Sequence, residues 1–182
     1  VLVDGQSSQG TVNRTKILQA ALDGRGQAVK AEDFMQLNRE DSRELLKGND
    51  VLYIYHNRID HTGDKMHSEG QAFEAAEQTL GDLIRLIKKL TAANANNLLI
   101  TADHGNVEQM NDLVTGQPHT AHTSQPVPLV YVGPQDIELS ENGTLSDIAP
   151  TLLQLMHMDP PVEMTGKSIA TINEPRSAEA DA

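Results

Sequence analysis

Three pairs of acidic and histidine side chains in this sequence have the types and the spacing to hold metal ions. They are Asp60 with Asp64, Asp103 with His104, and His119 with His122. Carboxylate oxygens and imidazole nitrogens bind zinc, manganese and other divalent ions in proteins. The chain has no cysteine, so thiolate ligands, disulfides and thiol nucleophiles are excluded, and any metal must be held by oxygen and nitrogen atoms.

Each pair lies next to a predicted strand. Residues 50–56 are a continuous β-branched and aromatic run, typical of a strand buried on both faces of a parallel sheet, and the first pair follows this run. Residues 96–101 form a second predicted strand directly before the second pair, and residues 126–132 form a third after the histidine pair. Ligands of open α/β sheets bind outside the carboxyl ends of the strands. The three pairs are therefore expected at one edge of the sheet.

The remaining pattern predicts a layered α/β fold. A short strand at the N-terminus and a weak strand and turn over residues 28–37 accompany several amphipathic segments. Helices are predicted at residues 13–22, 38–48, 68–90 and 144–156. This order predicts a three-layer α/β domain with a largely parallel sheet and helices on both faces. We expect one domain over residues 1–173 and a disordered tail, rich in Ala, Glu, Ser and Asp, over residues 174–182.

The composition limits the partners of the chain. Its 182 residues include 26 Asp and Glu against 14 Lys and Arg, and the formal charge of −12 disfavours a general nucleic-acid surface. No apolar run reaches the roughly 18 residues of a membrane span, and the first residues lack the pattern of a signal peptide. We therefore expect no membrane span and a cytoplasmic protein, in which an acidic small molecule would bind through a cation.

Each candidate also has a purely structural interpretation. The two aspartates can cap the following helix or bond a turn, the Asp-His pair can end a strand, and the two loop histidines can be solvated. His56 and Arg58 can meet an anionic substrate at a strand end, or be a satisfied histidine and a surface arginine. Asp4 is either a further ligand or part of an Asp-Gly turn. The coincidence of all three pairs with strand ends favours a metal site.

The second half contains four notable segments: LITADHGNVEQM at 99–110, HTAHTSQPVPLVYV at 119–132, LSDIAPTLL at 145–153 and EMTGK at 163–167. Together they closely resemble the C-terminal part of cofactor-independent phosphoglycerate mutase, a family of the alkaline phosphatase superfamily. The resemblance covers residues 97–170. It implies an alkaline-phosphatase-like core and phosphoryl transfer that uses two metal ions and a Ser or Thr nucleophile.

The first half, to about residue 95, contains VDGQSS at 3–8, NRTKIL at 13–18, AEDF at 31–34, YIYHNRID at 53–60 and TGDK at 62–65. These segments resemble a different branch of the same superfamily, the PglZ domain of phage-defence (BREX) systems. The chain thus combines a PglZ-like first half with a mutase-like second half from about residue 97.

The resemblance implies a set of metal ligands for one or two Mn or Zn ions. They are Asp60, Asp64, Asp103, His104 and His122. The Asp-His pair matches the ligands of the metal nearest the nucleophile, and Asp60 and His122 match ligands of the other metal. Asp64 stands where the mutase has a histidine, as in PglZ-like sequences. His61 is the alternative ligand if the His-Thr-Gly triplet is what aligns.

The resemblance also indicates what an active member needs. The family's first metal-binding aspartate and its nucleophile lie upstream of the PglZ-like stretch, and the mutase's inserted domain has no counterpart, so we expect an incomplete core and leave the nucleophile unassigned. Ser7, Ser8 and Thr11 are candidates only if Asp4 replaces that aspartate, at a spacing that departs from the family.

The predicted function is a metal-dependent phosphoryl-transfer domain, a phosphatase or phosphomutase, that acts on a phosphorylated small molecule. Two alternatives remain open. One is a phosphoglycerate mutase that interconverts 2- and 3-phosphoglycerate. The other is a catalytically inactive PglZ-type interaction module of a phage-defence system, which would have a protein partner.

Overall fold

The computed structural model describes residues 2–4, 26–56, 69–94, 97–119 and 121–173. The chain divides into two compact units, residues 1–131 and 132–182, and each is described here by itself. The prediction of one domain over residues 1–173 stays a prediction, and the predicted tail lies outside the described residues.

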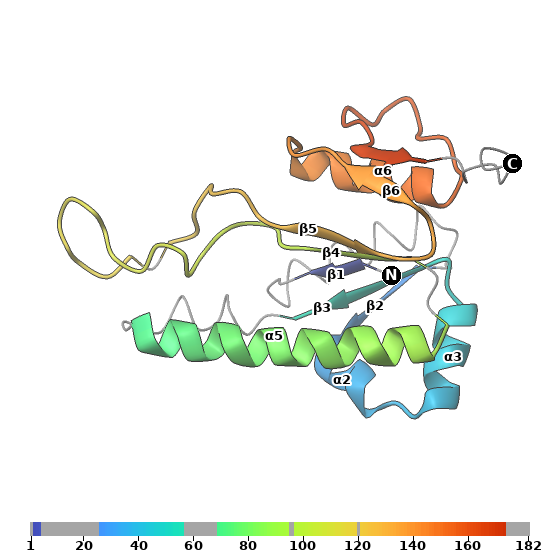
Figure 1. Cartoon of the computed structure of the whole chain (residues 1–182), viewed down its shortest axis with the longest axis horizontal. Coiled ribbons are helices and arrows are strands. Elements are labelled where there is room, and N and C mark those ends of the chain that lie inside the picture. Colours follow the sequence, from blue (N-terminus) through green and yellow to red (C-terminus); the bar gives the residue numbers. More distant parts are fainter. Residues whose placement is uncertain (1, 5–25, 57–68, 95–96, 120, 174–182) are drawn as a thin grey trace, which may run out of the picture. The chain divides into compact units, whose positions relative to one another are not determined.

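The first unit is built on a five-stranded sheet (Figure 1). In spatial order the strands are β2 (Gly26–Lys30), β3 (Val51–Tyr55), β1 (Leu2–Asp4), β4 (Leu98–Thr101) and β5 (Leu129–Val132). β3 is parallel to both β2 and β1, and β1 is parallel to β4, with Leu2 opposite Tyr53 on one side and Leu99 on the other. The three strands expected beside the candidate metal ligands are confirmed as β3, β4 and β5.

The central strands form the core of this unit because both of their faces are covered. Val51, Leu52, Tyr53 and Ile54 are all buried along β3. Leu98, Leu99 and Ile100 are buried along β4. A strand with both faces covered carries apolar side chains at successive positions instead of alternating with polar ones. This explains the continuous apolar runs in the sequence.

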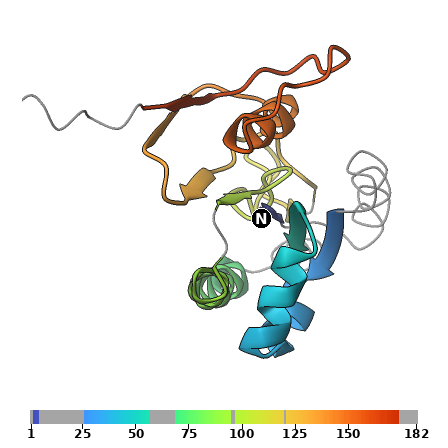
Figure 2. The same cartoon turned by 90° about the vertical axis from the view of Figure 1, so that its right-hand side faces the viewer.

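Three helices of the first unit lie on the same side of the strands (Figures 1 and 2). They are α2 (Ala31–Gln36), α3 (Arg39–Lys47) and α5 (Glu69–Ala92). The weak strand and turn predicted over residues 28–37 is in fact strand β2 followed directly by α2. The predicted helix at residues 13–22 lies outside the described residues, so the three-layer arrangement with helices on both faces stays a prediction.

Local contacts explain where the helices begin and how they are held. The Asn38 side chain caps α3 by accepting hydrogen bonds from the backbone N–H groups of Glu40 and Asp41, at 2.8 and 2.9 Å. Lys89 of α5 donates to the backbone carbonyl of Met35 at 2.8 Å and also to that of Leu37 after α2. Burial lowers the pKa of Lys89. These bonds tie α5 to the end of α2.

The second unit contains a short helical segment and a small sheet. Strands β6 (Ile137–Leu139) and β7 (Ala170–Ile172) pair antiparallel, and the 3-10 turn η1 (Leu145–Asp147) leads into α6 (Ile148–Leu155). This confirms the predicted helix near residues 144–156.

Asp147 organises the second unit. Its carboxylate accepts from the backbone N–H groups of Lys167 and Thr144, each at 2.8 Å, and from the Thr144 hydroxyl, and these bonds lower the pKa of Asp147. Gly166 is required beside this contact, because a Cβ there would lie 2.1 Å from the backbone oxygen of Ser146. Asp147 and Gly166, which belong to the mutase-like segments at 145–153 and 163–167, therefore have structural roles in this unit.

No helix in the described part of the chain is long and apolar enough to cross a membrane.

Candidate functional site

Asp103 and His104 follow β4 at its carboxyl end, as the sequence predicts. Their side chains are mostly buried, with 18% and 21% of the side-chain surface exposed, and His104 Nε2 lies 3.5 Å from Asp103 Oδ2. The other ring nitrogen, Nδ1, lies 3.1 Å from the backbone oxygen of Gly105. Because a carbonyl oxygen only accepts, Nδ1 is the donor in this contact, and Nε2 is the ring nitrogen that faces Asp103.

His122 is stacked on His104, although the two residues are far apart in the sequence. The ring centroids are 3.6 Å apart and the planes differ by 13°. A two-way backbone pairing between Gly105 and Thr123 brings the rings together: Gly105 N–H donates to Thr123 at 3.3 Å, and Thr123 N–H donates to Gly105 at 2.9 Å. Each histidine thus stands directly before one member of the pair.

Glu108 is a site residue that sequence reasoning missed. Its carboxylate accepts a hydrogen bond from the backbone N–H of Asn106 at 2.7 Å and another from the Thr123 hydroxyl. Desolvation acts to raise the pKa of Glu108. The two hydrogen bonds just named, a further hydrogen bond from the backbone of Glu108 itself, and the charge of the nearby His104 together outweigh desolvation and lower the pKa. A Cβ added at Gly105 would lie 2.1 Å from Glu108 Oε1, so the glycine leaves room for this carboxylate.

His119 is separated from the other candidate ligands by the geometry of the arm, by which we mean residues 105–123. The arm runs out from the sheet and returns to it (Figure 1). A second pairing, between Asn111 and Pro118, lies farther out along it, where His119 N–H donates to Met110 at 2.8 Å. His119 therefore stands away from the base of the arm.

The tip of the arm is ordered by Asp112. Its carboxylate accepts from the backbone N–H and hydroxyl of Thr115, at 2.7 and 2.9 Å, and from the Val114 N–H at 2.9 Å. These hydrogen bonds, in that order, lower the pKa of Asp112, and His119 adds to the effect. The function of Asp112 is therefore to close the turn.

Asp4 is the last residue of β1, opposite Tyr55 in β3, and its part as a ligand stays a prediction. Seven other candidate residues fall outside the described part of the chain. These are Asp60, Asp64, His61, Arg58, Ser7, Ser8 and Thr11. Among the residues that are described, no three or more His, Asp or Glu side chains are arranged to hold a metal ion by themselves. The structure places Asp103 beside His104 and stacks His122 on His104, which are two pairwise contacts among three of the five predicted ligands. The complete ligand set stays a prediction.

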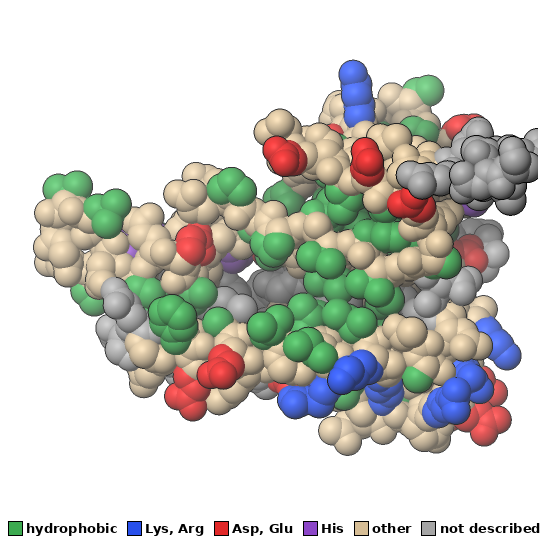
Figure 3. All heavy atoms as spheres, in the orientation of Figure 1, with side chains coloured by type: hydrophobic (Ala, Val, Ile, Leu, Met, Phe, Trp, Pro, Cys, Tyr) green, Lys and Arg blue, Asp and Glu red, His purple; other side chains and the backbone are tan. Residues whose placement is uncertain are grey.

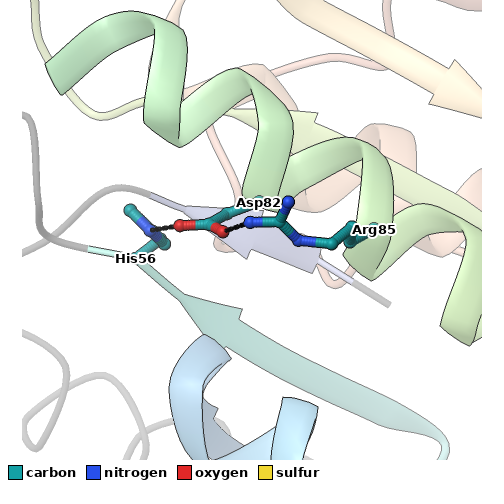
Figure 4. Close-up of polar contacts among 3 residues, drawn as sticks. All are labelled: His56, Asp82 and Arg85. Atoms are coloured by element: carbon teal, nitrogen blue, oxygen red, sulfur yellow. Dashed lines mark hydrogen bonds and ion pairs between the residues drawn. The ribbon is translucent and has the colours of Figure 1, made fainter. Parts of the chain in front are cut away.

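His56, at the end of β3, belongs to a separate polar cluster (Figure 4). His56 Nε2 lies 3.8 Å from Asp82 Oδ2, and Arg85, one turn along α5, contacts the other Asp82 oxygen. The histidine therefore has an acidic neighbour, which favours its structural interpretation. The cluster borders a pocket of about 300 Å³ between α2 and α5. The pocket is lined by Ala31, Glu32, Met35, Gln36, His56, Thr79, Asp82, Leu83, Arg85 and Leu86.

Known proteins similar to this chain include several phosphoglycerate mutases. The chain is 45% identical over 119 residues to the 2,3-bisphosphoglycerate-independent phosphoglycerate mutase of Pseudomonas putida strain GB-1, an alignment that covers 65% of this chain and 22% of the relative. It is 52% identical over 111 residues to the enzyme of the same name from Yersinia pestis strain Pestoides F, covering 61% and 21%. The chain thus spans about a fifth of the length of these relatives.

A solved structure shares the fold. A phosphoglycerate mutase of Leishmania mexicana, crystallised at low cobalt concentration, superposes with a TM-score of 0.62 over 79% of this chain and 28% of its own, at 21% sequence identity. The family described as "BREX system PglZ alkaline phosphatase-like domain" matches residues 1–147, which include Asp103, His104 and His122 as well as the first half. This chain therefore belongs to the PglZ alkaline phosphatase-like domain family.

Proposed function

We propose that this chain is a metal-dependent phosphoryl-transfer domain that acts on the phosphate ester of a small molecule. The proposed ligands of one or two Mn or Zn ions are Asp60, Asp64, Asp103, His104 and His122. The observation that carries the proposal is the grouping of the last three at the carboxyl end of β4. Membership of an alkaline phosphatase-like family and the similarity to phosphoglycerate mutases support it.

The donor atoms of Asp103 and His104 fit a shared metal ion. Two ligands bound about 2.1 Å from one tetrahedral ion lie about 3.4 Å apart. The observed separation of His104 Nε2 and Asp103 Oδ2 is 3.5 Å. The bond between Nδ1 and the Gly105 carbonyl holds the ring in the tautomer that a metal requires. The pair is therefore oriented for coordination.

The position of His122 supports a second ion. Its ring lies 3.6 Å from that of His104, and paired metals in phosphoryl-transfer sites are about 3.5–4 Å apart. Parallel rings at this spacing can serve neighbouring ions. Glu108 and the Gly105–Thr123 pairing hold the two rings in register, so their part in the site is to position His104 and His122.

Electrostatics indicate the order of binding. The chain carries a formal charge of −12, and the three described ligands include a carboxylate and no cationic side chain, so a phosphate dianion is repelled by the bare site. Bound divalent ions would offset the phosphate charge and stabilise the transferring group. We therefore expect phosphate esters to bind only after the metal.

The first test is metal-dependent stabilisation. Mn²⁺ or Zn²⁺ at about 100 times its Kd should raise the Tm by about 5–10 °C, because it binds only the folded chain. Asp103→Asn and His122→Ala should lose most of this shift, whereas His119→Ala, a histidine on the same arm but away from its base, should keep it. An equal shift in all three variants would show that the ligands lie elsewhere.

The second test is catalysis. With metal bound, hydrolysis of p-nitrophenyl phosphate should be detectable and should be lost in the double variant Asp103→Ala, His122→Ala.

Two other functions have specific support. Phosphoglycerate mutase activity is favoured by the mutase relatives, and interconversion of 2- and 3-phosphoglycerate would reveal it. The description of the matching family names the BREX system, and an inactive interaction module of such a system would show metal-dependent stabilisation without any turnover.

A further inference from the structure

A pocket of about 400 Å³ lies between the first turns of α5 and the near part of the arm. It is lined by Ala72, Phe73, Ala76, Val107, Glu108 and Met110. In Figure 3 hydrophobic side chains gather where this half of α5 meets the arm. A pocket of this size and lining is typical of small-molecule sites.

The pocket borders the proposed metal site through one shared side chain. Glu108 lines the pocket, and the same carboxylate is bonded to Asn106 N–H and to the hydroxyl of Thr123, the residue after His122. His104 is close enough to act electrostatically on Glu108. The pocket and the proposed metal site are therefore neighbours that share the Glu108 side chain.

The residues that line the pocket indicate which chemical groups would bind in it. Of the described residues that line the pocket, five are apolar and none is Lys or Arg. Among these described residues Glu108 alone is charged, and its carboxylate would repel a second anionic group such as the carboxylate of phosphoglycerate. Phe73, with 79% of its surface exposed, and Met110 offer a ring face and a sulfur atom, both of which attract aromatic rings.

We propose that this pocket receives the aromatic group of the substrate, so that the preferred substrates are phosphate monoesters of aromatic alcohols and not phosphorylated acids. This rests on the proposed phosphoryl-transfer function. In the hydrolysis of such an ester, the P–O bond to the aromatic oxygen breaks and a P–O bond to a water oxygen forms. A proton from water goes to the aromatic oxygen, and the products are the aromatic alcohol and phosphate.

The pocket is tested first without catalysis. Saturation-transfer NMR on the whole chain should detect binding of phenol, a neutral aromatic probe that needs no metal. Ala76→Leu, which fills the pocket, and Phe73→Ala, which removes the exposed ring, should each weaken phenol binding about 5- to 10-fold. Leu80→Ala is the matched control, because Leu80 is an exposed residue of the same helix that does not line the pocket.

The second measurement compares two esters in the presence of Mn²⁺. We expect kcat/KM for phenyl phosphate to exceed that for glycerol 2-phosphate by about 10- to 100-fold, and Ala76→Leu to remove most of the difference. Absence of phenol binding, or equal loss for both esters in Ala76→Leu, would overturn the aromatic site. Phenol binding that depends on Phe73 and Ala76, without hydrolysis of either ester, would support the aromatic site and overturn the proposed function.

Discussion

Replacing Gly105 with alanine tests whether close packing at the base of the arm sets the position of the histidines. The added Cβ would lie 2.1 Å from Glu108 Oε1 and 2.3 Å from Thr123 Oγ1, far inside van der Waals contact. Both obstructing atoms belong to side chains that can move. Moving them breaks the hydrogen bond from Thr123 to Glu108 and weakens the bond that Glu108 accepts from Asn106.

The size of the effect follows from these two bonds. A hydrogen bond to a charged group contributes about 1.5–3 kcal/mol, and the lower end applies because Glu108 is exposed. Losing one bond and weakening the other should lower the free energy of unfolding by about 2–3 kcal/mol. In a chain of this length that corresponds to a fall in Tm of about 4–12 °C.

The assay is urea unfolding followed by circular dichroism, with Gly70→Ala as the matched control. Nothing lies within 4 Å of a Cβ added at Gly70, which is in α5, so alanine there should stabilise the chain by up to about 1 kcal/mol. In a Glu108→Ala background the added cost of Gly105→Ala should shrink, since one obstructing side chain is gone. If Gly105→Ala were as stable as Gly70→Ala, the steric reasoning would be refuted.

Two further predictions concern stability. Backbone N–H groups and a threonine hydroxyl bind the carboxylates of Asp112 and Asp147 and lower the pKa of each. Their contribution to stability is therefore complete above about pH 4, the unfolded value, and is lost as the pH falls through the lower folded values. Tm measured at acid pH should fall less steeply in Asp147→Asn than in the unchanged protein, and an identical slope would contradict this. Thr151→Val should cost about 1–3 kcal/mol in urea unfolding, because the buried hydroxyl donates to Asp147 O at 2.7 Å and accepts from Ile169 N–H at 3.1 Å. The control is Thr171→Val, at an exposed strand position. If both variants lowered the free energy of unfolding equally, the buried hydrogen bonds of Thr151 would not contribute to stability.

The parts of the fold that could be predicted are those in which burial leaves a strong pattern. β3 is buried at four successive residues, Val51 to Ile54, and its sequence shows this as an unbroken apolar run. β2 and α2 were not separated, because α2 has six residues and only Ala31 and Phe34 are buried in it. The three-residue strands β6 and β7 were not predicted, since they are too short to show an alternating pattern.

The candidate site also contains residues that could be predicted from the sequence and residues that could not. Asp103 and His104 could be predicted because they follow a buried strand directly, and their place depends only on that strand. Glu108 was missed because its partners are a backbone N–H and a hydroxyl on the returning half of the arm, which no local pattern reveals. Residue type alone does not separate His119 from His122, and it was the family resemblance that selected His122. The Gly105–Thr123 pairing gives the physical reason why His122 meets His104.

The arm also makes this protein easy to label at one point. Its base is closed by the Gly105–Thr123 pairing, and at its tip Leu113 and Val114 are 90% and 93% exposed. Because the chain has no cysteine, Val114→Cys would create a unique thiol, and a fluorophore or spin label could be attached there, at the tip of the arm and not at its base. Movement of the arm on metal binding could then be followed directly, without altering a residue at its base.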